Sequence, residues 1–152
     1  MDKQQIEILG RNRLISELVA ADLEVSIPIR DRGVDIIAYR ELSGKFPKFV
    51  AAPIQMKAAS NAAFSIDEKY QRISSLILAF VWGLRYPDSA YTYALTHKES
   101  LAIAKKMKWK FSNGRFSTSK PSEKLRELLE SHKIKNPDQW WEKIQKVTNS
   151  VQ

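Results

Sequence analysis

The spacing of apolar residues near the start of the chain predicts a helix. Between residues 4 and 23, apolar side chains recur every three to four positions, which is the period of an amphipathic helix. The apolar stripe that this spacing predicts consists of Leu14, Ile15, Leu18 and Val19.

Further along, the period shortens to two, which predicts strands separated by turns. Gly33 marks the turn 30–33 because its backbone is permissive, and a second turn covers 43–45. Pro53 favours an edge position or a bulge, because proline donates no hydrogen bond to a neighbouring strand. The run 76–84 is apolar throughout and predicts a buried strand. The alternating runs, rich in β-branched and aromatic residues, are 25–29, 34–39, 49–57 and 91–96.

The second half of the chain predicts mostly helix. After a linker over 58–65, the segment 67–75 is either helical or a loop. Asn113 and Gly114 mark a turn. The helices predicted from periodicity and N-terminal residues are 98–107, 122–131 and a last helix that starts at Asp138 and carries Trp140, Trp141, Ile144 and Val147.

This order of elements predicts one α/β or α+β domain over residues 1–152. A helix comes first, strands follow, and helices end the chain, which is typical of a central mixed sheet flanked by helices. The chain has no internal repeat and no composition change that would mark a second domain.

The chain is basic, with 25 Lys and Arg against 17 Asp and Glu and a formal net charge of +8. Such a charge suits a polyanionic partner, although a solvated basic surface is the alternative. The stretch between Ser100 and Ser122 has no acidic residue, and its cations are interleaved with aromatic residues that either contact nucleic acid or belong to the core. These residues are Lys105, Lys106, Lys108, Lys110, Arg115 and Lys120, with Trp109, Phe111 and Phe116.

Asp35, Gln55 and Lys57 form the strongest candidate site. Gln55 and Lys57 are two positions apart on one predicted strand, so they point to one face while Ile54 and Met56 point to the other. Asp35 lies among apolar residues on the neighbouring predicted strand, so the three polar groups can converge. A charged side chain between apolar neighbours is costly unless it has a partner or a function.

These groups suit phosphodiester hydrolysis. That reaction needs a hard cation held by oxygen ligands near the phosphate, and a fixed positive charge. Asp35 offers a carboxylate, Gln55 a carbonyl oxygen and Lys57 the positive charge. The backbone carbonyl of Met56 offers a further ligand. We therefore predict a Mg²⁺ site at Asp35 and Gln55, where Mn²⁺ could substitute.

At these residues the sequence resembles the PD-(D/E)XK nuclease superfamily, which includes type II restriction enzymes, Holliday junction resolvases and some homing endonucleases. The matching pieces are Gly33-Val34-Asp35 and Gln55-Met56-Lys57, after a first helix, within residues 4–97. The resemblance implies a restriction-endonuclease-like core, with a central mixed sheet of four to five strands, flanking helices and a helical C-terminal segment. It also implies that Asp35 is a metal ligand, that Gln55 is the second ligand position and that Lys57 is the catalytic lysine.

The sequence departs from the family pattern at two positions. Val34 stands where the pattern has Pro, and Gln55 stands where it has Glu or Asp. Glutamine offers an oxygen without a charge, so weaker metal binding is expected. The resemblance includes active members of the Gln-x-Lys form, among them a homing endonuclease of similar length encoded by a cyanobacterial intron. A descendant that binds DNA without cutting it is the alternative.

Many members of that superfamily add an acid from the first helix, and here the candidates are Glu7 and Glu17. Glu7 and Arg11 share the helix face of the apolar stripe, so Glu7 is preferred, whereas Glu17 lies nearer the flank beside Arg13. The alternatives are ion pairs between Glu7 and Arg11 and between Glu17 and Arg13. Arg11 and Arg13 are also candidates for phosphate contacts.

Four more basic residues are candidates for DNA contacts. Arg30 and Arg32 precede Asp35, and Lys108 and Lys110 belong to the basic stretch; solvation is the alternative for each. The residues 69–72 either lie near a phosphate or form an exposed helix. His97 and His132 are isolated and are not expected to act as ligands or bases.

The leading hypothesis is a metal-dependent endonuclease that cuts double-stranded DNA, with sequence specificity of the homing or restriction type. Cutting two strands with one site per chain calls for a homo-oligomer, either a dimer or a tetramer. The alternatives are a resolvase for branched DNA, a DNA-binding module that has lost activity, and a basic protein whose partner is not nucleic acid.

Composition limits the other classes. The chain has no cysteine, which excludes disulfides and thiolate zinc sites. No apolar run has the length of a membrane span, and the first residues lack the apolar segment of a signal peptide. We therefore expect a cytoplasmic protein, associated with the nucleoid through DNA and without a membrane partner.

Overall fold

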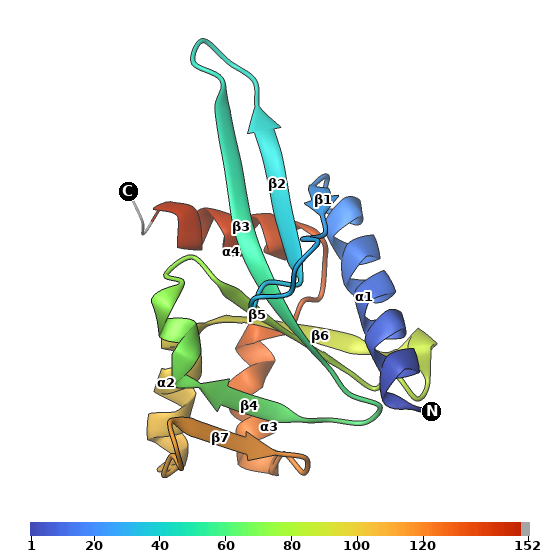
Figure 1. Ribbon diagram of the computed structural model, residues 1–152, viewed down its shortest axis with the longest axis vertical. Coiled ribbons are helices and arrows are strands. Elements are labelled where there is room, and N and C mark those ends of the chain that lie inside the picture. Colours follow the sequence, from blue (N-terminus) through green and yellow to red (C-terminus); the bar gives the residue numbers. More distant parts are fainter. Residues whose placement is uncertain (150–152) are drawn as a thin grey trace.

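A five-stranded mixed sheet forms the centre of the computed structural model, which describes residues 1–149 (Figure 1). β3 and β5 are parallel, and the other neighbours are antiparallel. Two further strands form a separate antiparallel ribbon. The sheet runs in the order β1 (Glu24–Ser26), β2 (Ile36–Leu42), β3 (Lys48–Ala58), β5 (Ile77–Trp82), β6 (Tyr91–Thr96), and the ribbon pairs β4 (Phe64–Asp67) with β7 (Arg115–Thr118).

Helices cover both faces of the sheet. α1 (Lys3–Ala20) and α4 (Asp138–Asn149) pack on one face, and α2 (His97–Met107) and α3 (Glu123–Leu129) pack on the other together with the β4–β7 ribbon. Short 3₁₀ helices are η1 (Glu68–Arg72), η2 (Pro87–Ser89) and η3 (Glu130–His132). The predicted α+β class with a mixed sheet and a C-terminal helix is confirmed; residues 150–152 of the predicted domain lie outside the described residues.

β5 separates two hydrophobic cores. All its side chains are buried; the odd-numbered ones belong to the first core, between the sheet and helices α1 and α4. The even-numbered ones belong to the second core, between the sheet, α2, α3 and the β4–β7 ribbon. Successive side chains of a strand point to opposite faces, so a strand covered on both faces must be apolar throughout. This double covering explains the unbroken apolar run over 76–84.

α1 packs on the sheet through Leu14 and Leu18, which are fully buried. Ile15 is partly buried against the same core, but Val19 is 58% exposed, so its predicted place in the stripe was wrong. Each helical residue lies about 100° around the axis from its neighbour, which turns Val19 away from the face that Leu18 occupies.

Gly10 brings the first half of α1 close to β3. A Cβ atom at Gly10 would lie 2.7 Å from the Cβ of Ala58 and 3.3 Å from the sulfur of Met56. Any side chain there would therefore push the helix away from the end of the strand. This close approach places the start of α1 beside the last residues of β3.

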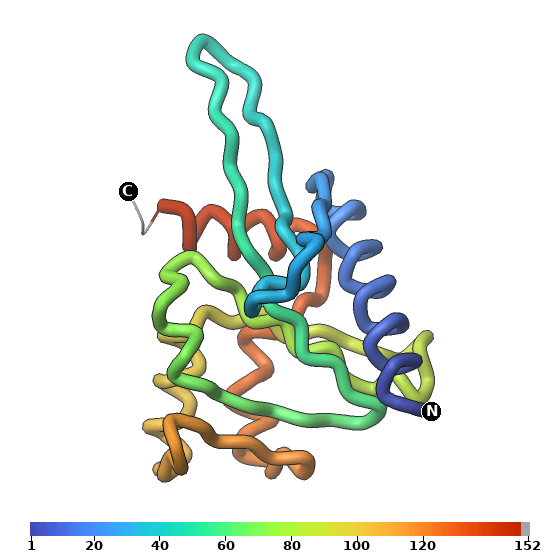
Figure 2. The backbone as a smooth tube through the Cα atoms, in the orientation of Figure 1, coloured from blue at the N-terminus to red at the C-terminus, as the bar shows by residue number. Residues whose placement is uncertain are grey.

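The β2–β3 hairpin extends well beyond the rest of the sheet (Figures 1 and 2). Its two strands pair from Ile36 with Ile54 out to Leu42 with Lys48. β5 pairs with β3 only over 54–58, so the outer half of the hairpin is a two-stranded arm. Pro53 lies just before this pairing begins, where β3 is paired with β2 alone, which fits the predicted edge position.

The β4–β7 ribbon is the part of the fold that the sequence pattern did not predict. The ribbon pairs Phe64 with Thr118 and Asp67 with Arg115, two segments far apart in the chain. Its four-residue strands are too short for alternation to be distinctive. The predicted linker over 58–65 therefore ends inside a strand, and the Asn113–Gly114 turn leads into β7.

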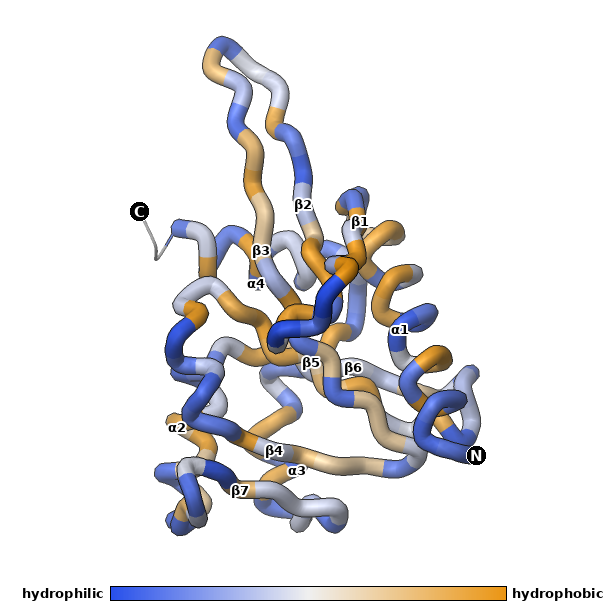
Figure 3. Tube along the Cα trace, in the orientation of Figure 1, coloured by the Kyte–Doolittle hydropathy of each residue, from blue (hydrophilic) through white to orange (hydrophobic). Residues whose placement is uncertain are grey.

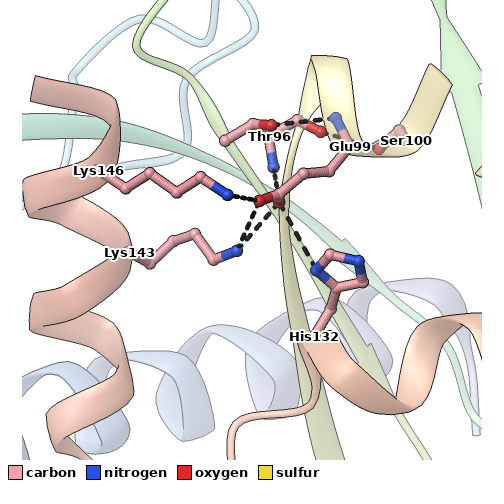
Figure 4. A network of polar contacts seen from close by, with 6 residues as sticks. All are labelled: Thr96, Glu99, Ser100, His132, Lys143 and Lys146. Carbon is pink, nitrogen blue, oxygen red and sulfur yellow. Dashed lines mark hydrogen bonds and ion pairs between the residues drawn. The ribbon is translucent and has the colours of Figure 1, made fainter. Parts of the chain in front are cut away.

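A polar network around Glu99 joins the C-terminal helix to α2 (Figure 4). The Glu99 carboxylate accepts hydrogen bonds from Lys143, Lys146 and the backbone N–H of Thr96, and His132 Nδ1 lies 3.6 Å from it. Burial opposes ionisation, but these donors together lower the pKa of Glu99 to about 2. The network fastens α4 across the sheet and gives His132 a structural place rather than a catalytic one.

No helix within residues 1–149 combines the length and the apolar character that crossing a membrane requires.

Candidate active site

Asp35 and Gln55 meet at the inner end of the β2–β3 hairpin. Asp35 precedes β2, and its backbone N–H donates to Ile54 O at 2.9 Å. The Asp35 Oδ2 atom accepts hydrogen bonds from Gln55 Nε2 and from the backbone N–H of Met56, both at 2.7 Å. The turn before Asp35 depends on Gly33, which has a φ of 88° and donates to Asp31 Oδ1. The predicted convergence of Asp35 and Gln55 is therefore present.

The Gln55 amide has a donor group between two oxygens and an acceptor without a partner. Its Nε2 atom donates to Asp35 Oδ2 and also approaches Met56 O at 3.3 Å. Its Oε1 atom is buried and has no hydrogen-bond partner among the described residues. A buried acceptor without a donor costs free energy, and such atoms are concentrated at sites that bind something.

Lys57 lies on the same face of β3 as Gln55, because the residues alternate with Ile54 and Met56 of the first core. The Lys57 ammonium sits 5.3 Å from the centre of the Tyr70 ring. Burial lowers the pKa of Lys57 and the Arg115 guanidinium lowers it further, whereas Asp35 and Asp67 oppose this shift. Lys57 is thus a partly desolvated cation whose field acts strongly on its neighbours.

Burial also acts on Asp35 and raises the pKa of its carboxyl group. The Met56 N–H and Arg11 oppose this shift, and the carboxylates of Asp31 and Glu7 add to it. The site therefore holds a carboxylate in surroundings that disfavour its charge, which is typical of a group kept for a ligand.

We expect Asp35→Asn to unfold at the same temperature as the natural protein, or higher, at pH 7 in EDTA. A folded-state pKa above the unfolded value means that ionisation of Asp35 costs stability, and this cost appears as the pH rises above about 3.8, the ordinary pKa. Asparagine removes the charge, and its oxygen can still accept from Met56 N–H. Thermal unfolding measures this effect, with Asp88→Asn, at an exposed position of η2, as the control.

A clear fall in the melting temperature of Asp35→Asn would instead make Asp35 a structural residue. The same variant should also lose any stabilisation that divalent metal gives the natural protein, since a ligand that binds only the folded state raises stability.

A cleft of about 640 Å³ opens over these groups. It lies between the end of β3, the start of α1, the loop before β2 and the beginning of β7. A neighbouring hollow of about 370 Å³ shares Lys57, Ala58 and Arg115 with it and continues along the β4–β7 ribbon. The cleft is lined by Lys3, Ile6, Glu7, Asp31, Asp35, Gln55, Met56, Lys57, Ala58 and Arg115.

The two candidate acids of α1 have separate places. Glu7 lines the cleft and forms an ion pair with Arg11 at 2.7 Å. Glu17 lies elsewhere: it accepts from Thr92 and from the indole N–H of Trp140, and pairs with Arg13 at 3.0 Å. Burial raises the pKa of Glu17 against these partners. Glu17 therefore links α1 to β6 and α4, which leaves Glu7 as the acid of α1 at the cleft.

The predicted DNA contacts divide in the same way. Arg11 neighbours the cleft through Glu7, and Arg30 and Arg32 are exposed on the loop before Asp35. Arg13 is engaged by Glu17 and by the carbonyl of Pro87, away from the cleft.

Lys108 and Lys110 do not line the cleft, although both are exposed. Trp109 between them stacks on Phe116 at 3.9 Å and packs against the second core with Phe111. These aromatic side chains are therefore packing residues, which was one of the two alternatives for the basic stretch.

The sequence did not single out three residues of the site: Arg115 was named only within the basic stretch and Tyr70 only within residues 69–72, and Lys3 had no signal. Arg115 enters the cleft because β7 pairs with β4, Lys3 enters it because α1 lies close to β3, and Tyr70 meets Lys57 from η1. His97 is buried and lines a different hollow beyond Tyr70. Long-range pairing decides all of these positions.

Comparison with known proteins gives no match to a family model, to a curated protein or to a solved structure. The chemistry of the cleft is therefore the basis for a proposed function.

Proposed function

We propose that this chain is a divalent-metal-dependent endonuclease for double-stranded DNA, built on a restriction-endonuclease-like core. The observation that carries the proposal is the group of Asp35, Gln55 and Met56 O, held together beside the partly buried Lys57. The element order supports it, since α1 precedes the hairpin that bears both motifs in a mixed sheet. One departure is the segment between β3 and β5, which holds β4 and the short η1 in place of the helix that the family often has.

The donor set at the cleft fits a hard cation. The Gln55 NH₂ group now places partial positive charge between Asp35 Oδ2 and Met56 O, while Gln55 Oε1 is left without a donor. Turning the amide over would bring Gln55 Oε1 beside Asp35 Oδ2 and Met56 O, and a cation there would offset the repulsion among the three oxygens. Carboxylate, amide and main-chain oxygens are ligands that Mg²⁺ and Mn²⁺ accept.

Each residue then has a defined role. Asp35, Gln55 and the Met56 carbonyl would hold Mg²⁺ or Mn²⁺. A bound cation would polarise the scissile phosphate and lower the pKa of an attacking water. Lys57 places its ammonium on the same face and stabilises the negative charge that develops on the phosphate. Glu7 is positioned to orient the water or to complete the ligand set, once its ion pair with Arg11 loosens.

The charges around the cleft fit a duplex. Lys3 and Arg115 line it, and Arg30 and Arg32 are exposed on the loop beside it. With a net charge of +8, the chain attracts DNA phosphates, and this attraction should weaken steeply with salt. One cleft per chain cuts one strand, so a homodimer or tetramer would make the double-strand break, with sequence specificity of the homing or restriction type.

The second candidate function is DNA binding without cleavage. The uncharged amide at Gln55 favours it, since one carboxylate alone binds a divalent ion weakly. Resolution of branched DNA by the same cleft is the other alternative.

Incubation of the purified protein with supercoiled plasmid, linear DNA and a four-way junction tests the proposal. Nicks or breaks should form with Mg²⁺ or Mn²⁺, and they should be absent in EDTA and with Asp35→Ala purified in parallel. Preferred cutting of the junction would favour the resolvase. Salt-sensitive binding without cleavage would make the chain a binding module. An absence of DNA binding at low salt would contradict the endonuclease, the resolvase and the binding module alike.

A further inference from the structure

Among the described residues, no third strand pairs with the outer half of the β2–β3 hairpin, although Leu42 packs against the first core. β1 pairs with β2 only as far as Tyr39, and β5 pairs with β3 only from Ile54 inward. Beyond these points the two strands form the arm, residues 41–49, which projects from the body in Figures 1 and 2. A two-stranded hairpin is marginally stable in water by itself. A projecting arm of this kind is therefore expected to have a partner.

The arm exposes aromatic rings beside lysines. Phe46 is 83% exposed and Phe49 is 66% exposed, whereas large apolar side chains elsewhere are mostly buried. Lys45 lies 5.9 Å from the Phe46 ring, and Pro47 and Lys48 follow directly. Hydrophobic and hydrophilic stretches follow one another along the arm (Figure 3). The tip thus combines an apolar wedge with positive charges on both sides of it.

The base of the arm is held by side-chain contacts and leads directly to the cleft. Tyr39 contacts Phe49 at 5.4 Å between ring centres, and Arg40 is held by Asp22 and by the Trp141 ring. β2 starts next to Asp35, and β3 carries Gln55 at its inner end. From Asp35 to Gly44 the strand spans about 30 Å, since strands rise about 3.3 Å per residue. That length corresponds to about nine base pairs of duplex.

We propose that this arm is a second DNA-binding site, which holds the duplex about one helical turn from the point of cleavage. Phe46 enters the minor groove as a wedge at a base step, and Lys45 and Lys48 contact the phosphates on either side. Proteins that insert apolar side chains from the minor groove unstack a base step and bend the duplex there. The inference takes its class of partner, duplex DNA, from the proposed function. Because β2 and β3 connect the arm to the cleft, they align both along one duplex.

A second copy of the chain is a poorer occupant of the arm. Two arms packed against each other would bring Lys45 and Lys48 of both copies together, with Glu41 as the single acid within residues 41–49. Like charges at close range are unfavourable. DNA instead offers phosphates to the lysines and stacked bases to the ring.

Binding of mixed-sequence duplexes in Ca²⁺ or EDTA tests the arm. Phe46→Ser, and the pair Lys45→Glu with Lys48→Glu, should weaken binding to a duplex of about 40 base pairs by about tenfold or more, from lost stacking and lost phosphate contacts. Binding to a hairpin duplex of about six base pairs should change little, because that duplex is shorter than the distance from the cleft to the tip of the arm. Tyr86→Ser and Lys98→Glu, exposed residues outside both the arm and the basic stretch, are the controls.

A bend of the longer duplex, measured by energy transfer between its ends, should be present with the natural protein and absent with Phe46→Ser. Circular dichroism checks that each variant folds. Unchanged binding and bending by the arm variants would overturn the inference, as would a Phe46→Ser variant that only loses self-association. Arm-dependent binding by a protein that cleaves no DNA would contradict the proposed nuclease and leave the arm intact.

Discussion

Replacing Lys57 with methionine is expected to lower the rate constant of DNA cleavage by roughly a hundredfold to a thousandfold, the usual loss when one group that stabilises the transition state is removed. Methionine keeps the length and the apolar stem of the side chain, so packing on the Tyr70 ring should survive. The lost charge acts mainly when negative charge develops on the phosphate. Single-turnover cleavage in saturating Mg²⁺ should therefore show a lower rate constant with nearly unchanged DNA affinity.

Lys69 provides a matched control for Lys57. The Lys69 ammonium lies 5.2 Å from the centre of the same Tyr70 ring. Unlike Lys57, Lys69 is exposed, and its ammonium lies 3.7 Å from Asp67 Oδ2. Lys69→Met should cut DNA at nearly the natural rate. A Lys57→Met enzyme that keeps most of its activity would remove Lys57 from the mechanism. An equal loss in Lys69→Met would contradict a specific role for the Lys57 charge.

Gln55→Glu is expected to have opposite effects on the protein with and without metal. Without metal, glutamate places a second carboxylate beside Asp35 Oδ2 and removes the donor that now lies 2.7 Å from it. Like charges at this range raise the pKa of one carboxyl group and lower stability at pH 7. With metal, the added ligand charge should tighten Mg²⁺ or Mn²⁺ binding by about tenfold or more.

Calorimetric titration with Mn²⁺ and thermal unfolding with and without EDTA measure both effects. Gln71→Glu, on the exposed surface of η1, carries the same change of charge away from the Gln55 amide. It should change neither the stability in EDTA nor the affinity for Mn²⁺. Gln55→Ala should lose metal affinity without the charge repulsion. If Gln55→Glu binds Mn²⁺ no more tightly than the natural protein, position 55 is not a metal ligand.

The pairing of Asp35 with Gln55 was predictable because both signals are local. Alternation puts Gln55 and Lys57 on one face of β3, and the Gly33 turn fixes where β2 begins, so adjacent antiparallel strands bring Asp35 alongside. The side of α1 that faces the sheet was harder to predict. Val19 matched the helical period yet is exposed, while Gly10, which has no side chain to count in a pattern, makes the close contact with β3.

The choice between Glu7 and Glu17 depended on partners that lie far along the chain. Thr92 and Trp140 donate hydrogen bonds to Glu17, and Arg13 forms an ion pair with it. Neither Glu17 nor Arg13 therefore lies at the cleft. Arg115 reaches the cleft only because β7 pairs with β4. No periodicity within a helix or strand reports such pairings, since their free energy comes from contacts between distant segments.

By itself, the sequence determined most of the elements, the mixed sheet between helices, the strand that carries Gln55 and Lys57, and the strand that follows Asp35. Hydrophobic period and turn residues act over a few positions, and the backbone geometry of a strand converts them directly into faces. Only the tertiary structure decided which charges surround the cleft, that Gln55 Oε1 is buried without a donor, and that the hairpin continues outward as an arm with Phe46 at its end. These features depend on which elements contact one another and where strand pairing ends. The pairing of segments far apart in the chain decides both, and the local hydrophobic period does not report it.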